Sequence, residues 1–335
     1  MMREAIKKMK PYKPPLEGRA SGDYLLLDFN EMTIDCSPKV KEALSNLDNI
    51  QVYPEYGELD KRIAEYAGVS SDEVMVVNGS DQGIDIIMRA FLNEGDKVII
   101  PSPSFAMFYQ SAQIQGAEIL KPEYTDKFPL KEVLELASSA KLIVICNPNN
   151  PTGTLLLKED LIKILETGVP VLHDEAYFEF SGLTAKDLIS KYDNLFVCRT
   201  FSKQFGLAAL RAGYVISQKK NIDELMKIRG PYDINMAAKA AILAALDDVD
   251  YMKKYVSEVM EKSKPDLENF FKENNIKFWP SSSNFILIKP EDADKLYSEL
   301  KNQGILVRKR HKGTVRISVG TKEDINKLKK AFKYV

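Results

Sequence analysis

The sequence predicts an α/β protein with a mostly parallel sheet in a large domain and a smaller α+β domain beside it. Short β-rich segments alternate with helical patterns through the middle of the chain, as they do in parallel α/β sheets. These segments are almost continuously apolar, which indicates strands that are buried on both faces. The chain has 335 residues, more than a single hydrophobic core usually supports, so two domains are expected.

The alternating elements define the predicted large domain, residues 32–240. No internal repeat or low-complexity segment interrupts them. Its strands are expected at 73–79, 97–103, 142–148, 170–176, 195–201 and 212–217. Its helices are expected at 80–93, 104–115, 130–138, 158–166 and 203–210.

The rest of the chain follows a different pattern. Residues 236–275 form one long helical stretch, apolar all round at first and amphipathic later, and Pro265 should kink or interrupt it. We expect residues 1–31 and 241–335 to form the smaller domain together, because the N-terminal segment lacks a core of its own. Its later elements are expected as strand 284–289, helix 291–303, strands 305–309 and 314–319, and helix 321–333.

Composition excludes several classes of function. The 47 basic and 48 acidic residues nearly cancel, so the chain has neither a basic field for nucleic acid nor an acidic tail. The N-terminus does not resemble a signal peptide, and no apolar run is long enough for a membrane span. Cys36, Cys146 and Cys198 lie far apart and argue against a disulfide framework, which favours a cytoplasmic location. His173 and His311 are the only histidines, which argues against a histidine-based metal site.

Polar residues follow the predicted strands at the points where ligands bind in open α/β sheets. After the first strand, in "NGSDQGID", Gly79 allows a tight turn and Ser80, Asp81 and Gln82 open a helix. Backbone N–H groups at such a helix start can bind phosphate. A simple Ser or Asp helix cap is the alternative interpretation.

Two further strands end in comparable segments. In "NPNNPTG", Asn150 precedes Pro151 and is therefore extended, either as part of a structural turn or to hold its amide in one orientation. Asp174 ends the next strand, and a buried acid requires a cation or hydrogen-bond donors. A helix cap or a protonated heterocycle would each satisfy it.

Lys203 follows the next strand, within "FVCRTFSKQFGLAALRAGYVIS" (196–217). It could extend to solvent, or it could be a desolvated amine whose lowered pKa lets it attack a carbonyl. Four such sites, each directly after a strand, are better explained by one ligand site than by separate caps and turns.

These segments make the sequence similar to pyridoxal-phosphate-dependent aminotransferases of the aspartate aminotransferase fold, and most similar to histidinol-phosphate aminotransferases. The resemblance extends over nearly the whole chain. The matching segments are "LDFNE" (27–31), "VYPEYGEL" (52–59), "NGSDQGIDIIMRAF" (78–91), "PSPSFAMF" (101–108), "NPNNPTG" (147–153), "HDEAYFEF" (173–180), "RTFSKQFGLAALRAGY" (199–214), "SSNFILIK" (282–289) and "VRISVGT" (315–321).

The resemblance implies a role for each residue around the cofactor ring. Lys203 corresponds to the lysine that binds the cofactor aldehyde and then moves the proton at the substrate Cα. Asp174 corresponds to the aspartate that keeps the pyridine nitrogen protonated. Tyr177 and Asn150 would hydrogen-bond the phenolic oxygen, and Phe105 would stack on the ring.

The cofactor phosphate would lie at the predicted helix start, with a contribution from a second subunit. Tyr53 matches a tyrosine that reaches the phosphate of the neighbouring subunit's cofactor, with Tyr56 as the second candidate, which implies a homodimer with shared active sites. The other implied contacts are the backbone N–H groups of Ser80, Asp81 and Gln82, the hydroxyls of Thr200 and Ser202, and the guanidinium of Arg211.

Four more residues match positions that bind substrate. Arg316 corresponds to the arginine that pairs with the α-carboxylate of glutamate or 2-oxoglutarate, and Asn30 belongs to the "LDFNE" motif. Arg308 and Tyr12 resemble the contacts to the phosphate of histidinol phosphate. A solvated basic run is the alternative interpretation of "RKRHK" (308–312).

The expected activity is therefore histidinol-phosphate:2-oxoglutarate transamination in histidine biosynthesis, running ping-pong through pyridoxamine phosphate. The alternatives are an aromatic or broad-specificity aminotransferase, a threonine-phosphate decarboxylase, and a non-catalytic relative, against which the intact Lys203 and Asp174 argue. Three departures from the family pattern lie near the expected substrate entrance. They are "NEMTIDCSP" without the usual proline and glycine, Asp233 where asparagine is frequent, and the short segment between Arg308 and Arg316.

Overall fold

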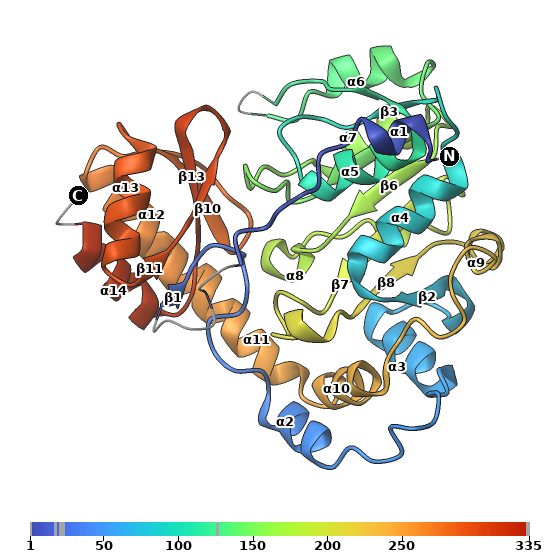
Figure 1. Cartoon of the computed structure of the whole chain (residues 1–335), viewed down its shortest axis with the longest axis horizontal. Coiled ribbons are helices and arrows are strands. Elements are labelled where there is room, and N and C mark those ends of the chain that lie inside the picture. Colours follow the sequence, from blue (N-terminus) through green and yellow to red (C-terminus); the bar gives the residue numbers. More distant parts are fainter. Residues whose placement is uncertain (1, 17–18, 20–23, 125–126, 333–335) are drawn as a thin grey trace.

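A seven-stranded sheet forms the centre of the computed structural model, which describes residues 2–16, 19, 24–124 and 127–332. The strand order is β2-β8-β7-β6-β5-β3-β4, with β8 antiparallel to both neighbours and every other pair parallel (Figure 1). The mostly parallel sheet is thus present. The strands are β2 Val74–Val77, β3 Lys97–Ile99, β4 Glu118–Leu120, β5 Leu142–Cys146, β6 Val171–Asp174, β7 Leu195–Thr200 and β8 Gly213–Ile216.

Each predicted strand of this sheet exists, somewhat shortened, and is buried on both faces. Val74 and Val76 of β2 belong to one apolar cluster, whereas Met75 and Val77 belong to another on the opposite face. Strand β4 was not predicted, because it is a three-residue edge strand that is only partly buried.

Helices cover both faces of the sheet. One face carries α4 and α5, and the other carries α3, α7 and α10, whose apolar residues complete the two clusters. The helices of the chain up to residue 246 are α1 Glu4–Lys7, α2 Pro38–Ser45, α3 Gly57–Ala67, α4 Gly79–Phe91, α5 Ala106–Gln115, α6 Leu130–Ala137, α7 Lys158–Leu165, α8 Phe178–Ser181, α9 Lys219–Leu225 and α10 Met236–Leu246.

A smaller antiparallel sheet, in the order β12-β13-β10-β9, has its own core (Figure 1). Its strands are β9 Lys277–Trp279, β10 Phe285–Lys289, β12 Arg308–Arg310 and β13 Thr314–Ser318. Beside it, β1 (Leu25–Leu26) pairs in parallel with β11 (Ile305–Leu306). The predicted strand 305–309 is therefore two strands in two different sheets. Helices α12 (Lys264–Glu273) and α13 (Ala293–Asn302) pack with these strands, and α14 (Lys322–Phe332) packs with α12.

The long helical stretch runs from the large sheet to the small one (Figure 1). After α10 it continues as α11 (Val249–Ser257), a π-helical segment at Glu258–Ser263, and α12. Pro265 lies in the first turn of α12, so the hydrogen-bond pattern changes directly before it, as predicted, although the helix does not end there. None of the helices in the described ranges is both long and apolar enough to cross a membrane.

The predicted helix 203–210 is wrong. The chain turns after β7 and forms only a short 3₁₀ segment at Ala208–Leu210. Gly206 and Arg211 both adopt the left-handed region, with φ of 70° and 53°, which a continuous α-helix excludes. The small and apolar residues of this segment pack as a turn rather than as a helix face.

Gly213 fixes the distance between β8 and the start of α4. A Cβ atom at this position would lie 2.6 Å from the Ser80 nitrogen and 2.8 Å from the Arg199 carbonyl oxygen. Gly213→Ala should therefore lower the free energy of unfolding by about 1–3 kcal/mol, measured by denaturant titration. Gly57→Ala is the control, because nothing lies within 4 Å of its Cβ position. Equal stability of the two variants would contradict the close contact.

Candidate active site

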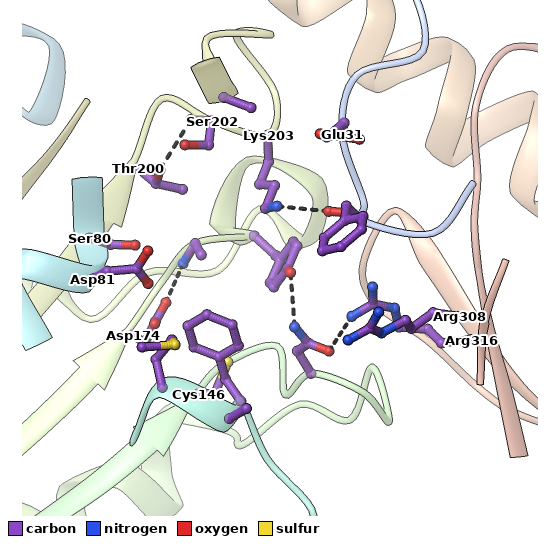
Figure 2. A pocket seen from close by; sticks show the side chains of 18 of the residues that line it. Glu31, Ser80, Asp81, Cys146, Asp174, Thr200, Ser202, Lys203, Arg308 and Arg316 are labelled. Carbon is purple, nitrogen blue, oxygen red and sulfur yellow. Dashed lines mark hydrogen bonds between the residues drawn. The ribbon is translucent and has the colours of Figure 1, made fainter. Parts of the chain in front are cut away.

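A cavity of about 520 Å³ lies beyond the carboxyl ends of the parallel strands and is lined by residues of both sheets (Figure 2). Figure 2 shows Ser80, Asp81 and Asp174 on one side, Arg308 and Arg316 on the other, and Lys203 extending between them. Most of the residues predicted from the sequence line this cavity. They are Tyr12, Ser80, Asp81, Phe105, Asn150, Asp174, Tyr177, Thr200, Ser202, Lys203, Arg211, Arg308 and Arg316.

Lys203 brings an amine to the centre of the cavity. Its Nζ donates a hydrogen bond to the carbonyl oxygen of Phe29 at 2.8 Å. Burial is the main cause that lowers the pKa of Lys203 to about 8, and the charge of Arg316 lowers it further. The turn that carries Lys203 is held by Gln204, whose Nε2 donates to the Thr200 carbonyl oxygen at 2.9 Å. The amine can therefore lose its proton near neutral pH.

Asp174 places a carboxylate at the end of β6, where it is only 2% exposed. Its Oδ1 accepts a hydrogen bond from the Ala176 backbone N–H at 2.9 Å. Burial raises the pKa of Asp174 to about 7 despite this bond, with a smaller contribution from the charge of Asp81. A partner that carries a proton or a positive charge would relieve this cost.

Tyr177 is fixed by two amides. Its hydroxyl oxygen accepts hydrogen bonds from Asn30 Nδ2 at 3.0 Å and from Asn150 Nδ2 at 3.2 Å. Because both contacts use the oxygen as acceptor, the O–H proton remains available to the cavity. Arg316 Nη1 in turn donates to Asn150 Oδ1 at 2.6 Å, so these side chains form one chain of hydrogen bonds. Asn30 does not line the cavity and contacts Tyr177 from behind.

The start of α4 offers an anion site. Gly79 begins the helix, and the first backbone N–H groups of a helix have no partner within it. Arg211 Nη2 lies over this turn and pairs with Asp81 Oδ2 at 2.8 Å. A Cβ atom on Gly79 would lie 2.6 Å from Arg211 Nη2, so only glycine allows this approach. The hydroxyls of Thr200 and Ser202 complete the same end of the cavity.

Gln82 turns away from this site. Its Oε1 accepts from the Asn78 backbone N–H and its Nε2 donates to Asp233 Oδ2, both at 2.6 Å. Asp233, one of the departures from the family pattern, thus contacts Gln82 and is not among the residues that line the cavity.

The hairpin of β12 and β13 supplies the opposite end. Arg308 and Arg316 are cross-strand partners, and the short segment between them is a tight turn at His311–Gly313. Arg308 Nη2 donates to the Tyr12 hydroxyl at 3.1 Å, which joins two residues predicted as a pair. Arg310 also lines the cavity. Arg310 was not among the residues predicted from the sequence, although alternation along a strand places it on the same face as Arg308.

The two tyrosines predicted to act across a dimer lie outside the cavity. Tyr53 is 69% exposed and stacks on Tyr232, with ring centroids 4.1 Å apart. The Tyr56 hydroxyl donates to the carbonyl oxygen of Ile234 at 3.1 Å. Tyr56 is half-buried, so Tyr53 is the one of the two with more surface to offer to another molecule.

A sheet of this topology, with a buried amine and a carboxylate facing one cavity, defines a class of enzyme. Residues 22–332 match the model of the family described as aminotransferase class I and II. The chain belongs to this family, and it is an aminotransferase that uses pyridoxal phosphate.

Comparison with individual proteins shows which members of the family this chain is similar to. Histidinol-phosphate aminotransferase from Staphylococcus aureus (strain MRSA252) is 37% identical to this chain, covering 99% of this chain and 100% of the relative. Histidinol-phosphate aminotransferase from Sinorhizobium meliloti, solved in complex with pyridoxal-5'-phosphate, has a TM-score of 0.91 at 22% identity, covering 99% and 96% of the two chains. Aspartate aminotransferase from Thermus thermophilus with maleate has a TM-score of 0.85 at 21% identity, covering 100% and 99%. The predicted fold is confirmed.

The residues of the cavity fit pyridoxal phosphate. The unpartnered N–H groups of α4, the nearby hydroxyls and Arg211 suit a phosphate. The carboxylate of Asp174 suits a protonated ring nitrogen, and the amine of Lys203 suits an aldehyde. Each of these groups has spare hydrogen-bonding or bonding capacity directed at the cavity.

Asp174→Asn should stabilise the cofactor-free chain at pH 8. In the folded chain Asp174 keeps its proton up to about pH 7, whereas the unfolded chain releases it near pH ~4. The stability contributed by the protonated group is complete below pH ~4 and is lost as the pH rises to 7. Asparagine mimics the protonated form, so the gain should be about 2–4 kcal/mol at pH 8 and near zero at pH 4, measured by denaturant unfolding.

The control is Asp193→Asn, which removes an exposed carboxylate paired with Lys220 at 2.7 Å. It should give no gain at pH 8. A gain from Asp174→Asn that is as large at pH 4 as at pH 8 would rule out the ionised carboxylate as its origin.

Proposed function

We propose that the chain transfers the amino group of histidinol phosphate to 2-oxoglutarate, in histidine biosynthesis. The observation that carries the proposal is a second anion site, formed by Arg308, Arg316 and Tyr12, on the side of the cavity opposite Ser80 and Asp81 (Figure 2). If the first site holds the cofactor phosphate, the second is available for the anionic end of a substrate. The similarity to a histidinol-phosphate aminotransferase over the full length of both chains supports this reading.

The roles of the central residues follow from their positions. Bound pyridoxal phosphate supplies an aldehyde that condenses with amines and a ring that takes up the electrons released at the substrate Cα. Lys203 Nζ would hold the cofactor aldehyde and would move the proton at the substrate Cα. The carboxylate of Asp174 would face the ring nitrogen, where a protonated nitrogen would offset the cost of burying the ionised carboxylate. Tyr177, held by Asn150, would donate its O–H to the phenolic oxygen, and Phe105 would cover the ring.

The phosphate of the cofactor would be held by the start of α4 and the groups around it. Ser80 and Asp81 contribute backbone N–H groups, since both line the cavity there. The side chain of Gln82 is committed to Asn78 and Asp233, so it can contribute only its backbone N–H. The remaining ligands are the hydroxyls of Thr200 and Ser202 and the guanidinium of Arg211.

Substrates would bind at the arginine end. Arg316, buried and bonded to Asn150, pairs with the α-carboxylate of glutamate or 2-oxoglutarate. Arg308 and Tyr12 would bind the phosphate of histidinol phosphate by donating hydrogen bonds to its oxygens. Asn30 contributes indirectly, because it positions the hydroxyl of Tyr177.

A spectroscopic experiment tests this function. Histidinol phosphate should bleach the cofactor absorbance of the purified enzyme, and 2-oxoglutarate should restore it. Lys203→Ala should reduce turnover by about 10²–10⁴-fold or more, because it removes the proton-transferring amine, while the chain remains folded. Bleaching by tyrosine or phenylalanine but not by histidinol phosphate would support an aromatic aminotransferase instead. Release of carbon dioxide from threonine phosphate would support the decarboxylase.

We further propose a homodimer in which Tyr53 reaches the cofactor phosphate of the partner subunit. Ile50, Val52, Tyr53 and Tyr232 are exposed by 56–74%, an apolar patch that supports an interface. Light scattering should give about twice the chain mass of 37.9 kDa.

The patch can be tested by substitution. Val52→Lys combined with Ile50→Lys should shift the protein towards monomers, because two charges would have to be buried at the interface. Leu183→Lys is the control, since Leu183 is 45% exposed elsewhere on the surface. A monomeric wild type, or a dimer indifferent to both lysines, would reject the interface.

We also propose two domains. Residues 32–240 form the cofactor domain, and residues 1–31 and 241–335 form the smaller one. The separate apolar clusters around the two main sheets support this division.

We further propose a cytoplasmic location. It is supported by the three cysteines, all of which are free thiols.

A further inference from the structure

Arg310 projects from the same face of the small sheet as Arg308 and Arg316. In the β12–β13 hairpin Arg308 pairs with Arg316, and Arg310 pairs with Thr314. Directly opposed residues share a face, and so do residues two apart on one strand. The three guanidinium groups therefore lie together, and all three residues line the cavity.

The residues on the opposite face of this hairpin do not line the cavity. Lys309 is exposed, and its Nζ donates to Asp294 Oδ1 of α13 at 2.5 Å. Val315, the cross-strand partner of Lys309, is fully buried in the core of the small sheet. The basic run "RKR" thus alternates between the cavity and the outer surface, and its two arginines are the residues that face inwards.

The arginine cluster, defined as Arg308, Arg310 and Arg316, has no carboxylate partner among the described residues. The acidic side chains that line the cavity are used elsewhere or lie at the other end: Glu31 pairs with Arg19, Asp81 pairs with Arg211, and Asp174 ends β6. Asp28, whose carboxylate pairs with Arg19, acts on Arg316 without pairing with it. Within the described ranges the three positive charges of the cluster therefore face the cavity with no carboxylate in direct contact.

Arg310 is the member of the cluster with the fewest contacts. Arg308 bonds to Tyr12, and Arg316 bonds to Asn150 and to the Asp28 carbonyl oxygen. No hydrogen bond of the Arg310 side chain is found within the described parts of the chain, and its Nε is buried without a partner. Burial and the charge of Arg308 both lower the pKa of Arg310. Arg310 is half-buried and partly withdrawn from water, so an anion that binds its guanidinium there gains more than one bound at a fully solvated arginine.

We propose that Arg310 is a third ligand for the phosphate of a phosphomonoester substrate, and that it makes the site favour phosphate over carboxylate. The inference rests on the proposed function, in which one substrate carries such a phosphate and the other carries only carboxylates. A phosphate monoester has three terminal oxygens and nearly two negative charges at neutral pH. A carboxylate has two oxygens and one charge, which a single guanidinium satisfies. The third guanidinium, that of Arg310, therefore strengthens mainly the binding of a phosphate and adds little to the binding of a carboxylate.

The test compares Arg310→Met with Lys309→Met in the cofactor-loaded enzyme. Each change removes one positive charge from the same strand, one inside the cavity and one outside. Arg310→Met should lower kcat/KM for histidinol phosphate about 10- to 100-fold and weaken competitive inhibition by inorganic phosphate by a similar factor, since it removes a charge-assisted contact. The half-reaction with glutamate should change less than about threefold. Lys309→Met should leave all three measurements at wild-type values.

Two more variants make the result decisive. Arg308→Ala should show the same selective loss, because Arg308 belongs to the cluster. Arg310→Lys keeps a charge in the cavity and tests the same contact if the methionine variant does not fold; it should lose less than Arg310→Met and only towards phosphate. Equal losses for histidinol phosphate and glutamate, or equal effects of Arg310→Met and Lys309→Met, would overturn the inference.

The outcome also separates this inference from the proposed function. If the wild type does not react with histidinol phosphate, the proposed function fails, and inhibition by inorganic phosphate still reports on Arg310. If the wild type reacts and Arg310→Met is unchanged in both reaction and phosphate inhibition, the inference alone fails.

Discussion

The buried carboxylate of Asp174 is the constraint around which the active site is built. Strand β6 lies between β5 and β7, and the register aligns Asp174 with Cys146 on one side and Cys198 on the other. The loop with Asn150 and the turn with Lys203 therefore leave the sheet at the same level as the carboxylate. Because the three strands are parallel, their carboxyl ends converge on one cavity. A protein group that neutralised Asp174 would have to occupy the cavity that Asp174 lines, which is where we propose the cofactor ring to bind.

The chain alone leaves this site electrostatically incomplete. Burial raises the pKa of Asp174 to about 7 and lowers that of Lys203 to about 8, so both groups are held away from their preferred charged forms. Among the described residues, no carboxylate pairs with the arginine cluster at the far end. In the proposed function, the cofactor and an anionic substrate would supply the missing partners. The free energy that folding gives up at these positions would then be recovered on binding, a common relation between active sites and stability.

The sequence was informative where residue type and strand position together determine a location. Strands buried on both faces appear as apolar runs, so the ends of β2, β5, β6 and β7, with their polar residues, could be found directly. Prediction of secondary structure failed where tertiary contacts, rather than local residue pattern, determine the backbone conformation. The segment after Lys203 has helical composition, yet Gly206 and Arg211 adopt left-handed conformations and turn the chain. Strand β4 is too short and too exposed at its start to produce a pattern.

Some residues of the active site could likewise be predicted from the sequence, and others could not. Asn30 was predicted to bind substrate, and only the structure reveals that its amide bonds to the Tyr177 hydroxyl and that it is not among the residues that line the cavity. Arg310 was missed because consecutive charges resemble a solvated surface. The alternation of a strand would have separated Arg310 from Lys309, but recognising it requires knowing that the run forms a strand.

Two adjacent carboxylates show how one strand serves both chemistry and stability. Asp174 faces the cavity, whereas Glu175 faces the opposite side and is completely buried. Glu175 pairs with Arg199 at 2.9 Å and accepts hydrogen bonds from the Ala185 backbone N–H and the Thr184 hydroxyl. Arg199 also lies 3.7 Å from the ring centroid of Phe178, the residue directly after Tyr177. The satisfied carboxylate behind the sheet thus anchors the segment that carries Tyr177. The carboxylate of Asp174 in front keeps only the hydrogen bond from the Ala176 backbone N–H, so it has capacity left for a cationic partner in the cavity.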